Sequence, residues 1–416
     1  MKSKLKWKKL IVLFFIILII LLNNSFVFAA SDEPNLISEA AILMDHKTGK
    51  ILYHKNENEK MYPASTTKIV TAILTLENCN LDDVVTVSYD AVMSIPDGYS
   101  SASLQIGEQL TVEQLLQLLL VHSANDAANV LAEYVGGSVE SFVSMMNTKV
   151  HELGLSNTHF TNAYGLHDDN HYTTAQDLAI IMKYCIKNED FRRISGSASC
   201  TLPATNKYGT RKYTSTNELI IPNNSNYYPY LTAGKTGYTS QAGDCLVSCS
   251  YKDDLELICV VLGGKTINGV STRFSETKTL YQYGYRNYSI KTLLHPNDIV
   301  TQIEVQNGTK ETRNLDLLAN NSIDALLENS VSIDNLPFEI NLKETIKAPI
   351  AQGDSLGTIS YTIDGIQYET DLIASHPVEE SKFLSSILQI GIGLLMILIV
   401  YTIFFNKKKK RNKKIY

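Results

Sequence analysis

The chain has 416 residues, of which 44% are hydrophobic and 19% are charged. This composition is typical of a globular protein with apolar segments added, and the length allows two domains plus targeting segments. Five Lys precede Leu10, and seven Lys or Arg follow Phe405. Without those twelve basic residues, the rest of the chain has 25 Lys and Arg against 43 Asp and Glu. This composition argues against nucleic acid as a partner, because phosphate binding needs basic patches.

The first 29 residues have the pattern of a secretory signal peptide. A basic region, Lys2–Lys9, precedes the apolar run Leu10–Leu22, and small residues follow where a signal would be cleaved. An uncleaved anchor is the alternative interpretation. The pattern predicts that the chain after residue 29 is exported.

Two short strands are expected next, at residues 40–45 and 50–54, joined by a turn at residues 46–49. After Pro63, the segment from Thr67 to Leu76 is apolar on nearly every side. That pattern is typical of a helix buried inside a core rather than one lying on a surface.

A helix-rich region follows. Thr111 and Gln114 have the spacing of a capping box at the start of a Leu-rich helix. The helical pattern breaks near residues 122–125, and a new helix should run to Tyr134 and end at the glycine pair 136–137. Further helical pattern covers residues 138–153 and 174–187.

From Leu231 the pattern becomes that of strands, with residues 243–250 and 255–262 paired across a turn at 252–254. Strands at both ends of this region, with helices between them, predict an α+β domain over residues 30–289. Its core would be an antiparallel sheet with an inserted helical lobe.

After about Tyr288 the helical signals fade, and short β-like stretches predict a small all-β domain at residues 290–378. These stretches are residues 300–305, 338–342, 358–363 and 366–370. No internal repeat is evident.

The run Phe383–Phe405 has 23 residues without a charge and is long enough to cross a bilayer. A buried core helix is the alternative, but the basic tail at residues 406–416 favours a transmembrane helix whose tail stays in the cytoplasm. We therefore expect a single-pass protein of the cell membrane, with residues of about 30–380 extracytoplasmic.

The chain has six Cys at irregular spacing, without a CxxC pair. Cys245 and Cys249 should lie on one face of a strand, a position that suits packing as well as bridging. Both possibilities stay open from the sequence.

Ser65 and Lys68 stand three residues apart, so a helix would place the hydroxyl and the amine on one face. A serine becomes a good nucleophile when a neighbouring base takes its proton, and a buried lysine can be neutral enough to do so. The same spacing at Ser275 and Lys278 shows that the motif alone is weak. The alternative interpretation of Ser65 is a helix N-cap.

Two further motifs strengthen the nucleophile hypothesis. Ser123-Ala124-Asn125 lies at the break between helices, and Lys235-Thr236-Gly237 lies in a strand where a peptide backbone could approach closely. Chance copies exist at residues 215–217 and 47–49. One arrangement alone places all three motifs in order on a helix start, a loop of the helical lobe and a strand.

This ordered set resembles the low-molecular-weight penicillin-binding proteins, the serine D-Ala-D-Ala carboxypeptidases of peptidase family S11. The resemblance covers roughly residues 35–378. It includes residues 63–68 (PASTTK), 165–166 (GL), 171–175 (HYTTA), 234–239 (GKTGYT) and 347–350 (KAPI). It implies a β-lactamase/transpeptidase-like catalytic domain and a C-terminal β domain.

The resemblance also implies roles for the motif residues. Ser65 attacks the penultimate D-Ala carbonyl, Lys68 takes its proton, and Ser123 relays a proton to the leaving D-Ala. The expected substrate-binding residues are Asn125, Lys235, Thr236, Gly237, Tyr238 and Arg273. The backbone N–H groups of Ser65 and Tyr238 would form the oxyanion hole, worth about 3 kcal/mol per donor.

The implied partners are peptidoglycan stem peptides as substrates and β-lactams as covalent inhibitors; the scheme needs no cofactor. Two departures stand out: Tyr238 follows the third motif where some relatives carry His, and the C-terminal segment is a full apolar span.

The segment 167–171 (HDDNH) suggests metal ligands, but we interpret it as an acidic loop before a helix capped by Thr173 or Thr174 and expect no metal.

Two rival functions would also use these motifs. A class A-like β-lactamase deacylates with a Glu some 30 to 40 residues beyond the second motif, and this chain has no Glu between Glu152 and Glu189. A non-enzymatic membrane protein that binds β-lactams or muropeptides would be expected to lose a motif residue, and its eleven-residue tail is too short for a signalling domain. The sequence does not distinguish carboxypeptidase from endopeptidase activity, vegetative wall from spore cortex, or one oligomeric state from another.

Overall fold

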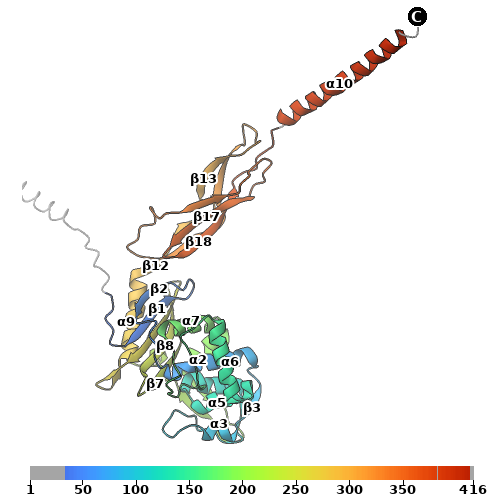
Figure 1. Cartoon of the computed structure of the whole chain (residues 1–416). Helices are drawn as coiled ribbons and strands as arrows, with labels where there is room; N and C mark the ends of the chain where they lie inside the picture. Colours follow the sequence, from blue (N-terminus) through green and yellow to red (C-terminus); the bar gives the residue numbers. More distant parts are fainter. Residues whose placement is uncertain (1–32, 382, 413–416) are drawn as a thin grey trace, which may run out of the picture. The chain divides into compact units, whose positions relative to one another are not determined.

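The structure is a computed structural model that describes residues 33–381 and 383–412. The chain divides into two compact units (Figure 1): the first ends at Ser289 and also includes residues 328–330, and the second comprises Ile290–Leu327 and the chain from Val331 onward. The predicted signal peptide at residues 1–29 lies outside the described residues.

A five-stranded antiparallel sheet forms the centre of the first unit, in the order β2-β1-β9-β8-β7. Its strands are β1 (Ala40–Asp45), β2 (Ile51–Lys55), β7 (Leu231–Thr239), β8 (Gly243–Lys252) and β9 (Leu255–Gly264). The first strand therefore pairs with the last, which confirms the prediction of a sheet built from both ends of the domain. The predicted strands 243–250 and 255–262 each extend two residues further.

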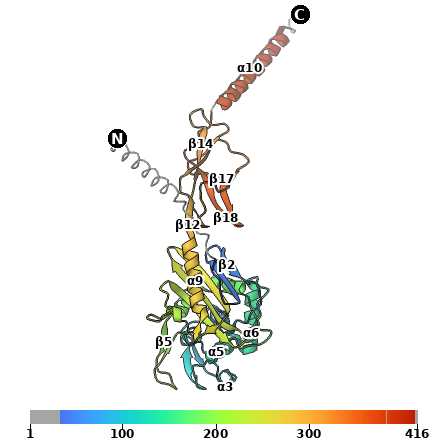
Figure 2. The same ribbon diagram turned by 90° about the vertical axis from the view of Figure 1, so that its left-hand side faces the viewer.

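Both faces of this sheet are covered by helices (Figure 2). Along β1, Ile42 and Met44 belong to the core shared with the helical lobe, whereas Leu43 packs beside Gly284 of helix α9 (Thr272–Asn287). Helix α9 was not predicted, because its sequence is rich in Thr, Tyr and Ser, which favour a helix only weakly.

The helical lobe is inserted between β2 and β7. Its helices are α2 (Lys68–Asn78), α3 (Tyr89–Met93), α4 (Val112–Gln117), α5 (Asn125–Gly136), α6 (Val139–Glu152), α7 (Ala175–Cys185) and α8 (Glu189–Ser195). The predicted capping box is confirmed: the Thr111 hydroxyl accepts a hydrogen bond from the Gln114 N–H, and the Gln114 side chain accepts one from the Thr111 N–H. Helix α2 is buried from Lys68 to Thr75, as the all-round apolar pattern predicted.

The sequence did not predict three short strand pairs of the first unit, one of which is the two-residue pair β10 (Thr266–Ile267) with β11 (Val270–Ser271). The other two are β3 (Val84–Thr86) with β4 (Gln109–Thr111), and β5 (Ser199–Leu202) with β6 (Arg211–Thr214). Their strands have only three or four residues and are largely exposed, so they lack the length and the apolar face that make a strand recognisable.

The second unit contains a five-stranded antiparallel sheet in the order β13-β14-β18-β17-β16 and the pair β12-β15. The bounds are β12 (Tyr288–Leu294), β13 (Ile299–Glu304), β14 (Asn314–Ala319), β15 (Ile323–Glu328), β16 (Glu339–Leu342), β17 (Ser355–Ile363) and β18 (Ile366–Ala374). All four predicted strands are present. Strands β12, β14 and β15 were not predicted; the Leu, Ala and Asp content of β14 and β15 does not favour a strand over a helix.

A C-terminal helix, α10 (Phe383–Asn412), ends the described chain. Among residues 33–381 and 383–412, we find no helix with the length and apolar character that crossing a membrane requires. The span predicted at residues 383–405 begins with residues whose side chains are not described, and it stays a prediction.

All six cysteines are free thiols. Cys245, Cys249 and Cys259 are fully buried in the central sheet, where burial raises the pKa of each thiol. Of the two possibilities that the sequence left open, the structure shows packing.

Candidate active site

Ser65 lies in a tight 3₁₀ turn, η1 (Ala64–Thr67), that leads directly into helix α2. No side chain caps either element, so Ser65 is not an N-cap. Ser65 is only partly buried, whereas Lys68, one turn later, is fully buried. The turn therefore presents a hydroxyl at the surface of the lobe with an amine beneath it.

Two close backbone approaches hold this turn. Ala64, just before the serine, has a φ of +48°, and Gly165 packs so tightly on it that any Cβ at position 165 would collide with the Ala64 carbonyl. On the other side, a Cβ at Gly237 would lie 3.0 Å from the Ser65 backbone nitrogen. The two glycines let the lobe and strand β7 enclose the backbone of the serine.

The Lys68 amine is surrounded by three oxygens. Its Nζ lies 2.9 Å from Ser65 Oγ, 2.6 Å from Asn125 Oδ1 and 3.0 Å from the Tyr164 carbonyl oxygen. Burial, and then the positive charge of Lys235, lower the pKa of Lys68 well below its usual value, although Asp126 opposes the shift. The amine is therefore poised to be neutral.

A neutral amine has two N–H groups and one lone pair. The carbonyl oxygens of Asn125 and Tyr164 can only accept, so they take the two N–H groups. The lone pair is then left for the Ser65 hydroxyl, which donates to it. This arrangement is the one that general-base activation of a serine requires.

The second motif lies where the Leu-rich helix breaks. A π-helical turn, η2 (Leu118–His122), ends at Ser123, whose backbone is left-handed with a φ of +68°, and α5 starts at Asn125. Lys235 of the third motif donates from Nζ to Ser123 Oγ (2.9 Å) and to the Thr236 carbonyl (2.8 Å). A hydrogen bond thus joins the second motif directly to the third.

Lys235 is fully buried, and burial followed by the charge of Arg273 lowers its pKa to about 7. Arg273, at the start of α9, donates to the Gly237 carbonyl (2.9 Å) and lies 3.5 Å from Asp244 Oδ1. Burial lowers its pKa as well. Tyr238, which follows the third motif, is 64% exposed.

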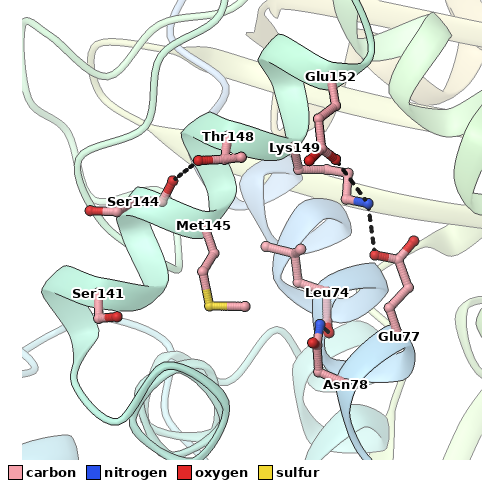
Figure 3. A pocket seen from close by; sticks show the side chains of 9 residues that line it. All are labelled: Leu74, Glu77, Asn78, Ser141, Ser144, Met145, Thr148, Lys149 and Glu152. Carbon is pink, nitrogen blue, oxygen red and sulfur yellow. Dashed lines mark hydrogen bonds and ion pairs between the residues drawn. The ribbon is translucent and has the colours of Figure 1, made fainter.

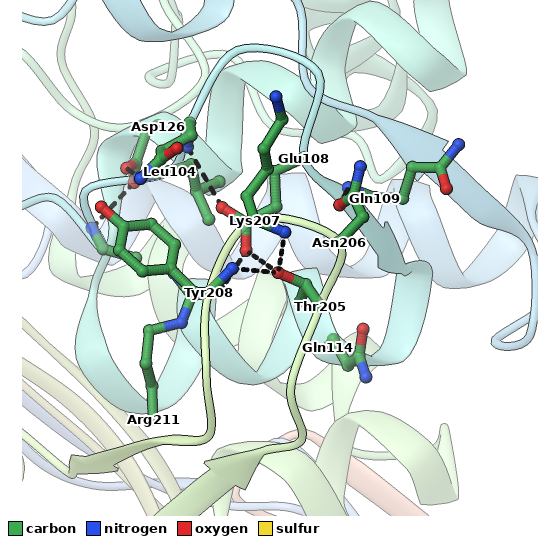
Figure 4. A network of polar contacts seen from close by, with 12 residues as sticks. Leu104, Glu108, Gln109, Gln114, Asp126, Thr205, Asn206, Lys207, Tyr208 and Arg211 are labelled. Atoms are coloured by element: carbon green, nitrogen blue, oxygen red, sulfur yellow. Dashed lines mark hydrogen bonds and ion pairs between the residues drawn. The ribbon is translucent and has the colours of Figure 1, made fainter.

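Asp126, which directly follows Asn125, fixes the segment beside the second motif (Figure 4). Its carboxylate accepts hydrogen bonds from the N–H groups of Ala102 and Leu104, each at 3.0 Å. Further along the same segment, buried Glu108 pairs with Arg211 of β6 and accepts from Thr205 at 2.9 Å. These contacts join residues 102–108 to the start of α5 and to the β5–β6 hairpin.

Three groups of the site were missed by the sequence analysis. The Tyr164 carbonyl is a backbone atom, which no side-chain pattern signals. Thr216, in the segment 215–217 that we set aside as a chance copy, places its hydroxyl 2.5 Å from that of Thr236. His171 approaches the nucleophile turn through Thr67, with Nε2 at 2.8 Å from the Thr67 hydroxyl, and burial lowers its pKa to about 3.

The segment 167–171 does not gather metal ligands. His171 Nδ1 accepts from the Thr161 N–H at 3.1 Å, and Thr174 caps α7 as one of the two predicted caps. Within the described residues, no cluster of His, Cys, Asp or Glu could hold a metal ion. The chance copy at residues 47–49 forms the turn between β1 and β2.

A cavity of about 430 Å³ lies elsewhere, between α2 and α6 (Figure 3). Its polar end is the ion pair of Lys149 with Glu77 (2.9 Å), and its apolar wall includes Leu74 and Met145. None of the three motifs contributes to it.

Comparisons with known proteins identify the family of both units. Residues 27–266 match the family Peptidase_S11, D-alanyl-D-alanine carboxypeptidase, and residues 288–380 match the family "Penicillin-binding protein 5, C-terminal domain". The chain is 32% identical to the D-alanyl-D-alanine carboxypeptidase DacF of Bacillus subtilis, over 84% of this chain and 87% of the relative. It is 33% identical to DacC, a D-alanyl-D-alanine carboxypeptidase of Escherichia coli, over 85% and 87%.

Among solved structures, penicillin-binding protein 5 from Haemophilus influenzae aligns with a TM-score of 0.63 at 30% identity, over 83% of this chain and 99% of that one. Fold and site together define a penicillin-binding protein: a transpeptidase-like catalytic unit with a C-terminal β domain. The chain belongs to the D-alanyl-D-alanine carboxypeptidase family, peptidase S11, and is a serine-type D-Ala-D-Ala carboxypeptidase.

Proposed function

We propose that the chain removes the terminal D-Ala from peptidoglycan stem pentapeptides through an acyl-enzyme on Ser65, and that β-lactams acylate the same hydroxyl. The observation that carries this proposal is the environment of the Lys68 amine. Its Nζ lies within hydrogen-bond distance of Asn125 Oδ1, the Tyr164 carbonyl oxygen and Ser65 Oγ. If the two carbonyl oxygens accept the N–H groups of a neutral amine, its lone pair is left for the Ser65 hydroxyl.

Acylation begins when Ser65 Oγ attacks the carbonyl carbon of the penultimate D-Ala and its proton moves to Lys68 Nζ. The oxyanion that forms would be held by the N–H groups of Ser65 and Tyr238. The Gly237 backbone beside the Ser65 nitrogen supports this, because it places β7 against the nucleophile turn.

The intermediate collapses by breaking the C–N bond, and the leaving amine needs a proton. Ser123 is suited to relay to it the proton that Lys68 took from Ser65, because the Ser123 hydroxyl accepts from Lys235 and keeps its own O–H free to donate. This transfer returns Lys68 to its neutral form. Lys235, Thr236 and Arg273 would bind the carboxylate of the departing D-Ala. Water then attacks the ester on Ser65, with Lys68 again as base, and releases the tetrapeptide.

The test is to incubate the purified protein with a pentapeptide ending in D-Ala-D-Ala and to measure free D-Ala. We expect release of one D-Ala per peptide, and no further release from the tetrapeptide product. Hydrolysis of penicillin in many turnovers, without D-Ala release, would instead identify a β-lactamase. Binding of penicillin without either reaction would identify a non-enzymatic receptor.

We further propose that the protein is anchored in the cell membrane by residues 383–405, with residues of about 30–380 extracytoplasmic. The uncharged run of 23 residues, the basic tail after it and the signal-like segment 1–29 support this topology. Such a placement would bring the active site to the peptidoglycan.

Protease treatment of intact cells checks this topology. We expect the catalytic unit to be digested while an epitope tag after residue 416 survives. A truncation before Phe383 should give a soluble enzyme that still releases D-Ala. Digestion of the tag with survival of the catalytic unit would invert the topology and make a wall substrate untenable.

A further inference from the structure

His171 is a buried residue that belongs to none of the three motifs but contacts the nucleophile turn η1. It is only 2% exposed. On one side of its ring, Nε2 lies 2.8 Å from the hydroxyl of Thr67, the last residue of η1. On the other side, Nδ1 lies 3.1 Å from the backbone nitrogen of Thr161 and 3.2 Å from its hydroxyl. The imidazole therefore joins the nucleophile turn to the loop formed by residues 161–166.

The contacts of this imidazole decide which nitrogen carries its proton. The backbone N–H of Thr161 can only donate, so Nδ1 of His171 accepts and carries no proton. Burial lowers the pKa of His171 to about 3, although the charge of Asp168 opposes the shift, so the ring is neutral near pH 7. The single ring proton is therefore on Nε2, which donates it to the Thr67 hydroxyl.

Thr67 connects this hydrogen bond to the backbone beside the nucleophile. While its oxygen accepts from His171, its own O–H donates to the Ala64 carbonyl at 2.8 Å. Ala64 directly precedes Ser65 and has a φ of +48°, a conformation that residues with a Cβ rarely adopt. Such a backbone persists only where its surroundings fix it. The hydrogen bonds of His171 and Thr67 supply part of that constraint.

The loop on the other side of the imidazole, residues 161–166, supplies a partner of the catalytic amine. Its Tyr164 carbonyl accepts from Lys68 Nζ at 3.0 Å. One residue earlier, its Ala163 carbonyl accepts from the Thr71 hydroxyl of helix α2 at 2.5 Å. The imidazole thus contacts both the turn that carries the nucleophile and the loop that orients the base.

We propose that His171 is a positioning residue for acylation, which holds the Ser65 hydroxyl in register with the Lys68 amine by bridging the nucleophile turn and the 161–166 loop. Both ring nitrogens are used in this bridge, so His171 takes no part in proton transfer. The inference rests on the proposed function, because it assigns His171 a role in the acylation of Ser65. A displacement of about 1 Å between reacting groups can cost about 100-fold in rate, so a bridge of this kind has a measurable effect.

The experiment compares His171→Phe with His171→Gln in the full-length protein. Phe keeps a planar ring beside Phe160, whose ring centroid lies 5.3 Å from that of His171, but it removes both nitrogens. Gln keeps one acceptor and one donor in a planar group. His159→Phe is the matched control, because His159 is exposed and its Nδ1 lies 2.7 Å from the Asn170 carbonyl oxygen. Melting temperatures show whether each variant is folded.

We expect His171→Phe to lower the second-order rate constant for labelling by a fluorescent penicillin by about 10- to 100-fold, because the nucleophile and the base lose their common support. His171→Gln should recover most of this loss, since it restores both hydrogen bonds. His159→Phe should be labelled at the wild-type rate.

Thr67→Val tests the same hydrogen bonds from the other end. It keeps a β-branched side chain and removes the hydroxyl between His171 and Ala64, so labelling should slow by about 10-fold or more. If His171 acts through Thr67, the double variant should lie within about threefold of the slower single variant, whereas independent effects would multiply. Should His171→Phe prove unfolded, the labelling rate of Thr67→Val decides the assignment alone.

Wild-type labelling by either folded single variant, equal losses in His171→Phe and His171→Gln, or losses that multiply in the double variant would overturn the assignment of His171. The carboxypeptidase activity of the wild type would be untouched by these outcomes. A wild-type protein that neither takes up penicillin nor releases D-Ala would overturn the proposed function itself, so the two failures are distinguishable.

Discussion

Replacing Ser65 with Ala should abolish covalent labelling by penicillin and D-Ala release together, because both need the same oxygen to attack a carbonyl carbon. The fold should survive: Ser65 is only partly buried, and its side chain caps neither η1 nor α2. Intact-mass spectrometry after incubation with benzylpenicillin checks the prediction, since a penicilloyl adduct adds the full mass of the drug.

Ser275→Ala is the matched control, because Ser275 and Lys278 repeat the spacing of Ser65 and Lys68. In the structure, Ser275 donates to the Thr272 carbonyl at 3.0 Å, and Lys278 contacts Asn226 Oδ1 at 3.4 Å. The hydroxyl of Ser275 and the amine of Lys278 therefore contact other groups rather than each other. The Ser275→Ala protein should be labelled by penicillin at the wild-type rate. An adduct on the Ser65→Ala protein would disprove the assignment.

The order of the three motifs along the chain was enough to predict which residues meet. It worked because each motif requires a different element: a helix start, a break between helices and a strand. The same reasoning excluded residues 215–217 as a second motif, because this copy does not lie in a loop of the helical lobe as the order of the three motifs requires. Thr216 nevertheless lies at the site, since its place depends on the path of the segment after the β5–β6 hairpin, which the sequence pattern did not reveal.

The central sheet was predictable for a similar reason. Its strands are buried on both faces and give long apolar runs, as along β8 and β9. Helix α9 was not predictable, because its packing on the sheet outweighs a sequence of weak helix formers. The partners of Lys68 were only partly predictable: Asn125 belongs to a motif, but the Tyr164 carbonyl reaches the amine through a loop whose course is set by tertiary packing.

Lys68→Arg should slow acylation by at least two orders of magnitude, although it keeps a long basic side chain that is compatible with a helix. The reason is that a guanidinium stays protonated at any usable pH and cannot accept the Ser65 proton, and removing a general base costs about 10²- to 10⁴-fold. The rate constant for labelling by a fluorescent penicillin measures the loss. Lys278→Arg makes the same chemical change in the Ser275–Lys278 pair, which repeats the spacing of Ser65 and Lys68. This variant should be labelled by the fluorescent penicillin at the wild-type rate.

The pH dependence separates the base from a structural role of Lys68. Burial and then the charge of Lys235 lower the pKa of Lys68 well below its usual value, which favours the neutral amine that the mechanism uses as the base. The wild-type acylation rate should therefore fall as the pH is lowered through this pKa, because the amine gains a proton and loses the lone pair that faces Ser65. The Lys68→Arg protein, if its melting temperature shows that it is folded, should have lost this acid limb along with the rate. Near-normal acylation by the Arg variant, or an unchanged acid limb, would mean that another group activates Ser65.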